Sequence, residues 1–414
     1  MSRQVDADKQ HFTTKGKNAE QVLSDLAEKT FLADWCFLNP HLPNGKELCD
    51  LLVVFDEIAI IWQVKDLKLD THGNVKSREV EKNVKQLAGA RRQLFDLKTP
   101  IELYNPRRRK ETFDPSSINE VHLISALMGE EGDAMNMAEI IKNQFAHVFT
   151  KSFLPVLLEE LDTIRDFCGY LAAREAVISE KRVGEMSGGE QDLLAYYLMH
   201  DRSFSSIGNV INVNKGLWGQ FRNSSAYQRK KEADEISYYW DDIINRVHEV
   251  LDHPPFPERY ERVARIMAWP NRLYRRMLGA SFAEAQLFAD SIPPTQKKDQ
   301  VFRRVVPTTF GATYCFLFHD ISAYDDSLRE TRFLMLQALC YVMRGVVQQN
   351  KVVIGIGTEM TMKDECTFDF VGIQIPIWTS EDEKRLKSYQ RTYNFLSDAQ
   401  AFVHPVEEYP SETT

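Results

Sequence analysis

Three polar side chains lie at the ends of a strongly apolar stretch, ELCDLLVVFDEIAIIWQVKD at residues 47–66. Asp50 comes before the first apolar run, and Gln63 and Lys65 lie at the end of the second. Carboxylate and amide oxygens are ligands that hard cations such as Mg²⁺ accept. An ammonium group can orient a water molecule or offset developing negative charge. These three side chains could act on one substrate, provided that the fold brings them together.

A β-hairpin would bring them together. With Asp56-Glu57 as a two-residue turn, Asp50 falls opposite Gln63, and opposed residues of an antiparallel pair lie on one face, about 5 Å apart at Cβ. Strand alternation places Lys65 on the same face. The turn lacks the glycine that tight hairpins favour, and a bulge would shift this register. The other opposed pairs are then Phe55 with Ile58, Val54 with Ala59, Val53 with Ile60 and Leu52 with Ile61.

The flanking segments predict the elements that hold this hairpin. Apolar residues at helical spacing predict a helix over 19–32 and another over 77–95, the second capped by Ser77. The segments IELY at 101–104 and VHLISALM at 121–128 predict strands. The order of helix, strands, helix and strand describes a small α/β unit that ends near residue 150.

The motif and the order of elements resemble the PD-(D/E)XK nuclease superfamily. Asp50, a twelve-residue interval and Gln63-Val64-Lys65 are similar to its D–x(n)–(D/E/Q)–x–K core, and the glutamine resembles the Mrr-type restriction-endonuclease branch. Glu20 matches an acidic residue that such folds often place on the first helix, and Gln86 matches a polar contact from the next helix. The resemblance covers roughly residues 15–130. It implies a restriction-endonuclease-like α/β/α domain that hydrolyses phosphodiester bonds with Mg²⁺ or Mn²⁺.

The resemblance also implies a role for each residue of the motif. Asp50 would be the central metal ligand, and Glu20 would bind the ion directly or through water. The side-chain oxygen of Gln63 and the carbonyl oxygen of Val64 would complete the protein ligands. Lys65 would orient or deprotonate the attacking water and offset charge on the phosphate.

Two positions depart from the family pattern. Cys49 stands before Asp50 where the pattern has proline, and Gln63 replaces a carboxylate, which leaves one anionic ligand fewer. Glu20 or Glu47 would have to compensate. Glu20 can also be an ordinary exposed helical carboxylate and Glu47 an ordinary loop carboxylate, so both interpretations stay open at this point.

Basic residues gather downstream of the motif. Between Lys65 and Asp114 there are 13 Lys and Arg against 8 Asp and Glu, in a chain whose net charge is −9. Such a basic region can contact a phosphate backbone, although a solvated helix face is the usual meaning of these residues. The candidate nucleic-acid-binding residues are Lys82, Lys85, Gln86, Arg91, Arg92, Arg107, Arg108 and Arg109.

Composition narrows the class of protein. The chain has 414 residues with 43% hydrophobic content, enough for two or three packed domains. No apolar run approaches the roughly 18 to 20 residues that a membrane helix needs, and the first residues lack the apolar core of a signal peptide. The six cysteines are scattered and form no CxxC pair, so we expect buried free thiols in a reducing, cytoplasmic setting.

The remaining chain predicts further parts. We expect a flexible arm over 1–17, the nuclease-like domain over 18–150, a helical region over 151–290, a C-terminal α/β domain over 301–404 and a loose tail over 405–414. The segment MSGGEQDLLAYYL at 186–198 resembles the signature loop of ABC-type ATPases. No GxxxxGK[ST] loop accompanies it, so a glycine turn before a helix is expected instead. The ten histidines form no HExxH or HxH group.

The leading hypothesis is a metal-dependent nuclease, an endonuclease rather than an exonuclease and on DNA rather than RNA, which the resemblance associates with bacterial defence against foreign DNA. Two alternatives stay open: a nucleic-acid-binding or sensor protein whose catalysis has lapsed, and a protein whose function lies in residues 150–414. The expected partner is nucleic acid and not a membrane. A second copy of the chain, or a partner ATPase or sensor protein, is compatible with each hypothesis.

Overall fold

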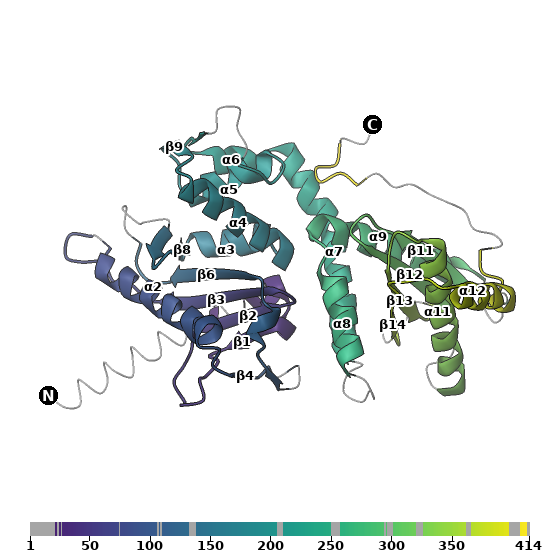
Figure 1. The fold of residues 1–414 in the computed structure, drawn as a ribbon. Helices are drawn as coiled ribbons and strands as arrows, with labels where there is room; N and C mark the ends of the chain where they lie inside the picture. Colours follow the sequence, from purple (N-terminus) through teal and green to yellow (C-terminus); the bar gives the residue numbers. More distant parts are fainter. Residues whose placement is uncertain are drawn as a thin grey trace, which may run out of the picture. The chain divides into compact units, whose positions relative to one another are not determined.

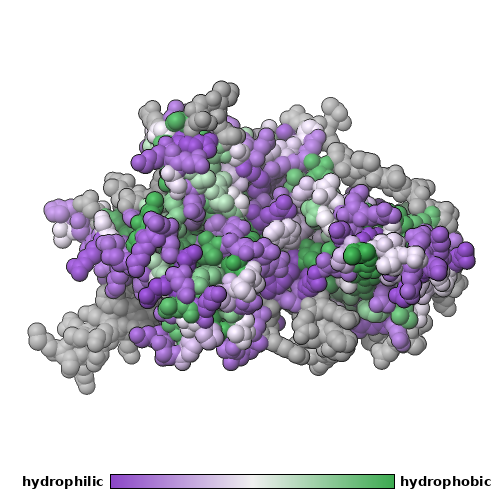
Figure 2. Space-filling model, viewed as in Figure 1, coloured by the Kyte–Doolittle hydropathy of each residue, from purple (hydrophilic) through white to green (hydrophobic). Residues whose placement is uncertain are grey.

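The computed structural model divides the chain into two compact units, Met1–Tyr227 and Gln228–Thr414. Both are mixed α/β (Figure 1). Figure 2 shows hydrophilic residues over most of the described surface on one face, with hydrophobic residues in smaller areas. Within the part of the chain that the structure describes, every helix is too short or too polar to cross a membrane. The structure describes residues 21–22, 25, 27–73, 75–105, 107, 110–131, 138–204, 210–249, 257–293, 295, 301–319, 326–361, 366–396 and 406–411.

A six-stranded mixed sheet forms the centre of the first unit. Its strands lie in the order β1-β2-β3-β6-β8-β7. The first three form an antiparallel meander, β6 and β8 run parallel to β3, and β7 pairs antiparallel at the edge. The strands are β1 (Cys36–Leu38), β2 (Leu51–Phe55), β3 (Ile58–Lys65), β6 (Glu120–Leu127), β7 (Ala138–Ile141) and β8 (Gln144–Thr150). Strands β1, β7 and β8 were not predicted from the sequence.

The hairpin of β2 and β3 has the predicted register, from Phe55 against Ile58 to Leu52 against Ile61. Asp56 makes the turn with φ 48°, in the left-handed region. Aspartate adopts this conformation more readily than most residues with a Cβ, because its short polar side chain bonds locally. The tight turn therefore forms without glycine.

Helix α2 (Ser77–Arg91) covers one face of the sheet (Figure 1). Val84 and Leu87 belong to the same buried cluster as Ile61 and Leu123 of the sheet. The helix begins at Ser77 itself and no side chain caps it, so the predicted Ser77 cap was wrong. The wider turn η2 (Arg92–Asp96) continues the helix.

Helices α3 (Phe153–Glu160) and α4 (Ile164–Ser179) cover the other face. Trp62 of β3 points to this side and stacks on Phe167 of α4, with ring centroids 5.8 Å apart. Because Trp62 and Gln63 are consecutive in a strand, they lie on opposite faces of the sheet. The smaller elements of this unit are η1 (Ala33–Trp35), β4 (Glu102–Leu103), β5 (Glu111–Thr112) and η3 (Pro115–Ser117).

The rest of the first unit contains short strands as well as helices. Gly188 and Gly189 connect β9 (Val183–Met186) to α5 (Glu190–Met199), which confirms the predicted glycine turn before a helix. Strand β10 (Ile211–Val213) pairs with β9 and is followed by α6 (Leu217–Arg222). The region 151–290, predicted to be helical, thus also includes two strands, and the boundary between the units falls inside it.

The second unit is built on a four-stranded sheet with the order β11-β12-β13-β14, in which β12 and β13 are parallel. It confirms the α/β character predicted for the C-terminal region. Of the six cysteines, five are buried and Cys366 is half-buried, and all are free thiols. The elements from the boundary onward are α7 (Ser225–Glu249), α8 (Pro257–Ala268), α9 (Arg272–Ser291), β11 (Val301–Pro307), β12 (Ala312–His319), α11 (Asp326–Val346), β13 (Val352–Thr358), β14 (Asp369–Gln374) and α12 (Ser380–Tyr393).

Candidate active site

Strand β3 extends beyond its neighbour β2. The β2–β3 ladder ends where Leu51 pairs with Trp62, and beyond that point the side chain of Asp50 bonds to β3. Its Oδ2 accepts hydrogen bonds from the backbone N–H of Val64 at 2.5 Å and from Nε2 of Gln63 at 2.6 Å. Asp50 is 7% exposed and Gln63 9% exposed. The predicted cross-strand contact between Asp50 and Gln63 is therefore present.

Lys65 lies on the same face as Gln63, two residues further along β3. Its Nζ is 3.0 Å from Oε2 of Glu79 on α2, and the two side chains are 30% and 42% exposed. The hydrogen bond from Lys65, together with its positive charge, holds the pKa of the Glu79 carboxyl below its usual value. Sequence reasoning missed Glu79. It lies one helical turn before Lys82 and two turns before Gln86, so the polar face of the helix was the available signal.

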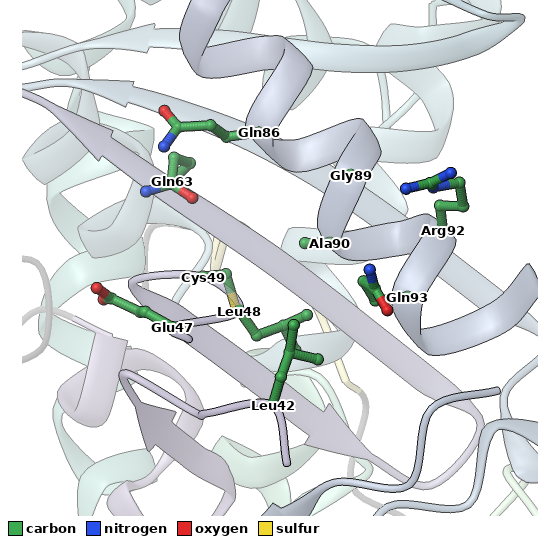
Figure 3. A pocket seen from close by; sticks show the side chains of 10 residues that line it. All are labelled: Leu42, Glu47, Leu48, Cys49, Gln63, Gln86, Gly89, Ala90, Arg92 and Gln93. Atoms are coloured by element: carbon green, nitrogen blue, oxygen red, sulfur yellow. The ribbon is translucent and has the colours of Figure 1, made fainter. Parts of the chain in front are cut away.

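A pocket of about 240 Å³ opens beside Gln63. In Figure 3, Gln63 and Gln86 lie toward one end of it and Arg92 and Gln93 toward the other. The wall formed by α2 includes Gly89, where an added Cβ would meet no atom within 4 Å. The pocket thus combines amide and guanidinium groups along an open side of the helix.

Glu47 also lines this pocket. The side-chain nitrogen of Asn39, oriented toward two acceptors, donates to Oε1 of Glu47 and to the backbone oxygen of Asp50, each at 2.9 Å. Asn39 thereby connects the Glu47 carboxylate to the backbone of the central acid. Of the two glutamates considered as additional ligands, the structure places Glu47 at the site, while Glu20 lies outside the described residues.

A buried amide side chain links helix α2 to the strands that carry the site. Asn83 of α2 is 1% exposed, and its Nδ2 donates to the backbone oxygen of Gln63 at 3.1 Å and to Oγ of Ser125 at 2.8 Å. It therefore ties α2 to both β3 and β6 at the level of Gln63. Asn83 was not singled out from the sequence, although a lone Asn between Val80, Val84 and Leu87 is the pattern of a buried polar contact.

The candidate nucleic-acid-binding residues that the structure describes differ in their surroundings. Gln86 and Arg92 line the pocket, and Lys82 is exposed on the same helix. Lys85 is instead paired with Glu81 one turn away. The rest of the predicted set has other partners or lies outside the described residues.

The two remaining arginines with described positions each lie near an acid. Arg91 is 3.6 Å from Oδ1 of Asp96, and Arg107 is 3.6 Å from Oδ1 of the buried Asp34. Arg108 and Arg109 lie outside the described residues. Of the predicted residues that the structure describes, Gln86 and Arg92 are the ones that line the pocket.

The donor atoms around Asp50 fit a hard divalent cation. Asp50 and Glu47 are carboxylates, and turning the Gln63 amide would exchange Nε2 for an oxygen beside Asp50. In a strand the N–H and C=O of one residue point to the same side, so the Val64 carbonyl faces the same space as the N–H that binds Asp50. Oxygen ligands of this kind suit Mg²⁺ or Mn²⁺.

No protein-family model, curated protein or solved structure matches this chain. The geometry of the site therefore carries the functional argument.

Proposed function

We propose that the chain is a metal-dependent nuclease that hydrolyses phosphodiester bonds, with DNA as the expected substrate. The single observation that carries the proposal is the contact of Asp50 with Gln63 and Val64, followed by Lys65 on the same face of β3. The order of three antiparallel strands, a helix and a parallel strand also supports the resemblance to the PD-(D/E)XK superfamily.

Asp50, the Gln63 side chain and the Val64 carbonyl would hold the ion, with Glu47 as the additional carboxylate. When bound, Mg²⁺ or Mn²⁺ would polarise a phosphate oxygen and lower the pKa of a water molecule. The ammonium of Lys65 would turn from Glu79 to the anionic phosphate, orient the attacking water and offset charge in the transition state. This exchange of partners needs little free energy because the ion pair is half-exposed.

The pocket beside Gln63 would receive the nucleotide next to the cleaved bond. Arg92 can contact a phosphate, and the amides of Gln86 and Gln93 can donate and accept hydrogen bonds. Contacts with the phosphate backbone of a nucleic acid give affinity but do not distinguish one base sequence from another. We therefore expect weak sequence preference and binding that falls with increasing salt concentration.

One observation favours a second function. Lys65 is already paired with Glu79, and the central position of the motif is the neutral Gln63. A protein that binds nucleic acid without cleaving it would have the same arrangement. The two functions make different predictions for the same experiment.

The test is to incubate the full chain with plasmid DNA, linear DNA and RNA in Mg²⁺ or Mn²⁺, and to compare it with Asp50→Asn and Lys65→Ala. Each variant should lose cleavage by about 100-fold or more, since general acid–base and charge-stabilising groups contribute at least that much. Lys351→Ala, an exposed lysine of the second unit, is the matched control and should cleave normally. Equal cleavage by the wild type and the three variants would show that this site takes no part in the reaction. Binding without cleavage by the wild-type chain would favour the second function.

A further inference from the structure

The pocket beside Gln63 has an apolar floor, formed by Leu42, Leu48, Cys49 and Ala90. The last three of these residues are 7%, 1% and 3% exposed, so a group that touches them must enter below the protein surface. Figure 3 shows Leu42 and Leu48 across the pocket from helix α2. A floor of this kind accepts an uncharged group and disfavours a phosphate, because a charge loses its hydration there without compensation.

The amide side chains of Gln86 and Gln93 lie on the rim of the pocket. Oε1 of Gln93 accepts a hydrogen bond from Oγ1 of Thr99 at 3.0 Å, which leaves its Nε2 as a donor. Gln86 is exposed, and its amide makes no hydrogen bond with the residues that the structure describes. The rim therefore offers donors and an acceptor, which the edge of a nucleobase needs. Because the Gln86 amide can turn, it can serve more than one base.

The charged groups of the pocket lie at its two ends. In Figure 3, Glu47 lies toward the end at Gln63 and Arg92 toward the other end. Their formal charges cancel, whereas a site for a phosphate group presents an excess of cations or backbone N–H groups. The interior is thus suited to a neutral ring, and Arg92 to the phosphate beside it.

The volume of the pocket, about 240 Å³, agrees with this occupant. At about 30 Å³ for each water molecule, it holds roughly eight waters, which is comparable to one nucleobase and too little for a base pair. We propose, on the basis of the nuclease function proposed above, that the pocket binds one unpaired base of the DNA strand that is cleaved. A paired base must unstack and lose its partner to enter, whereas a base in a single strand or a mismatch loses less. The chain therefore prefers single-stranded or mismatched DNA to a paired duplex.

Gly89 offers a way to close the pocket without changing a proposed metal ligand. It lies on the wall formed by α2, and an added Cβ would meet no atom within 4 Å, so Gly89→Leu fits the helix and extends into the pocket. The variant should fold, because leucine favours a helix more than glycine does. The matched control is Gly219→Leu, at an exposed glycine of α6 where an added Cβ also meets no atom within 4 Å.

The test is a binding titration of the full chain in metal-free buffer, where no cleavage occurs. Three DNA oligonucleotides of one sequence are compared: a single strand, a duplex with a central mismatch and a paired duplex. Each carries 2-aminopurine at the centre, a base analogue whose fluorescence rises when it leaves the base stack. The wild type should bind the first two at least about 10-fold more tightly than the paired duplex, with a rise in fluorescence. Gly89→Leu should lose both the preference and the rise, and Gly219→Leu should keep them.

Equal affinity of the wild type for the three DNAs would overturn the proposal, as would a Gly89→Leu variant that behaves like Gly219→Leu. These measurements need no catalysis, so they separate the base pocket from the proposed chemistry. Cleavage that requires Asp50 and Lys65, combined with equal binding of the three DNAs, would keep the nuclease and remove the base pocket. A chain that binds none of the three DNAs would overturn both.

Discussion

The two faces of the six-stranded sheet hold charged groups in different ways. On the α2 face, Lys65 and Glu79 are paired at 30% and 42% exposure. On the α4 face, Arg174 is fully buried and its partner Glu190 is 15% exposed. Water screens the first pair, so it can exchange partners at small cost, whereas a buried charge that loses its partner keeps the full cost of desolvation. The α2 face is therefore suited to reversible binding of a substrate, and the α4 face to a fixed arrangement of charges.

The largest expected effect is on the buried face. Arg174→Met removes the cation that binds both Glu190 and Nδ1 of His147, and it leaves a largely buried carboxylate unpaired. We expect the free energy of unfolding to fall by about 3–5 kcal/mol. Urea unfolding followed by circular dichroism measures this change. The exposed Arg92→Met on the other face is the matched control and should change stability by less than about 0.5 kcal/mol. Similar losses in the two variants would contradict the comparison.

The next largest effect is expected from the loss of a buried amide on the α2 face. Asn83→Ala removes the donor to the Gln63 carbonyl and to Ser125, and leaves these groups buried without it. A loss of about 1–3 kcal/mol is expected, together with weaker cleavage because Gln63 is no longer held in place. The control is Asn119→Ala, whose amide binds the exposed Glu57. If Asn83→Ala unfolds at the same urea concentration as the wild type, this amide does not support the site.

A smaller effect should appear as a pH dependence of the stability. Burial first, and then the charge of Arg174, holds the pKa of His147 well below its ordinary value of 6.5. The unfolded chain therefore takes up a proton near pH 6.5 that the folded chain does not. Stability is complete above this pH and falls as the pH drops below it, by at most about 1.4 kcal/mol per pH unit.

Urea midpoints measured from pH 7.5 down to 5 test this sign. His147→Gln should flatten the slope below pH 6.5. A slope that is the same in His147→Gln and the wild type would assign the pH dependence to other groups.

The local part of this fold could be predicted from the sequence. With Asp56-Glu57 as a two-residue turn between two apolar runs, the pairing of the strands follows, and it places Asp50 beside Gln63. The hairpin depends only on neighbours in the sequence, so strand alternation was sufficient. The helix after it was predicted for the same reason, from the spacing of its apolar residues.

The parts that could not be predicted depend on distant segments. Glu79 reaches Lys65 only because α2 crosses the sheet at a particular angle, which no periodicity specifies. The pocket likewise joins Leu48, in the segment before β2, to Ala90 of α2. A search for closely spaced motifs cannot find such a pocket. It becomes visible only when the packing of α2 on the sheet is known.

The smallest expected effect concerns the exposed ion pair. Glu79→Gln removes its charge and should change the free energy of unfolding by less than about 1 kcal/mol, because both partners are half-exposed. The difference should shrink further in high salt. Urea unfolding at low and high ionic strength measures it, with Glu81→Gln, the partner of Lys85, as the matched control. A loss of several kcal/mol would mean that Lys65 is fixed rather than exchangeable. If the loss is small, a loss of cleavage in Lys65→Ala reports on chemistry and not on folding.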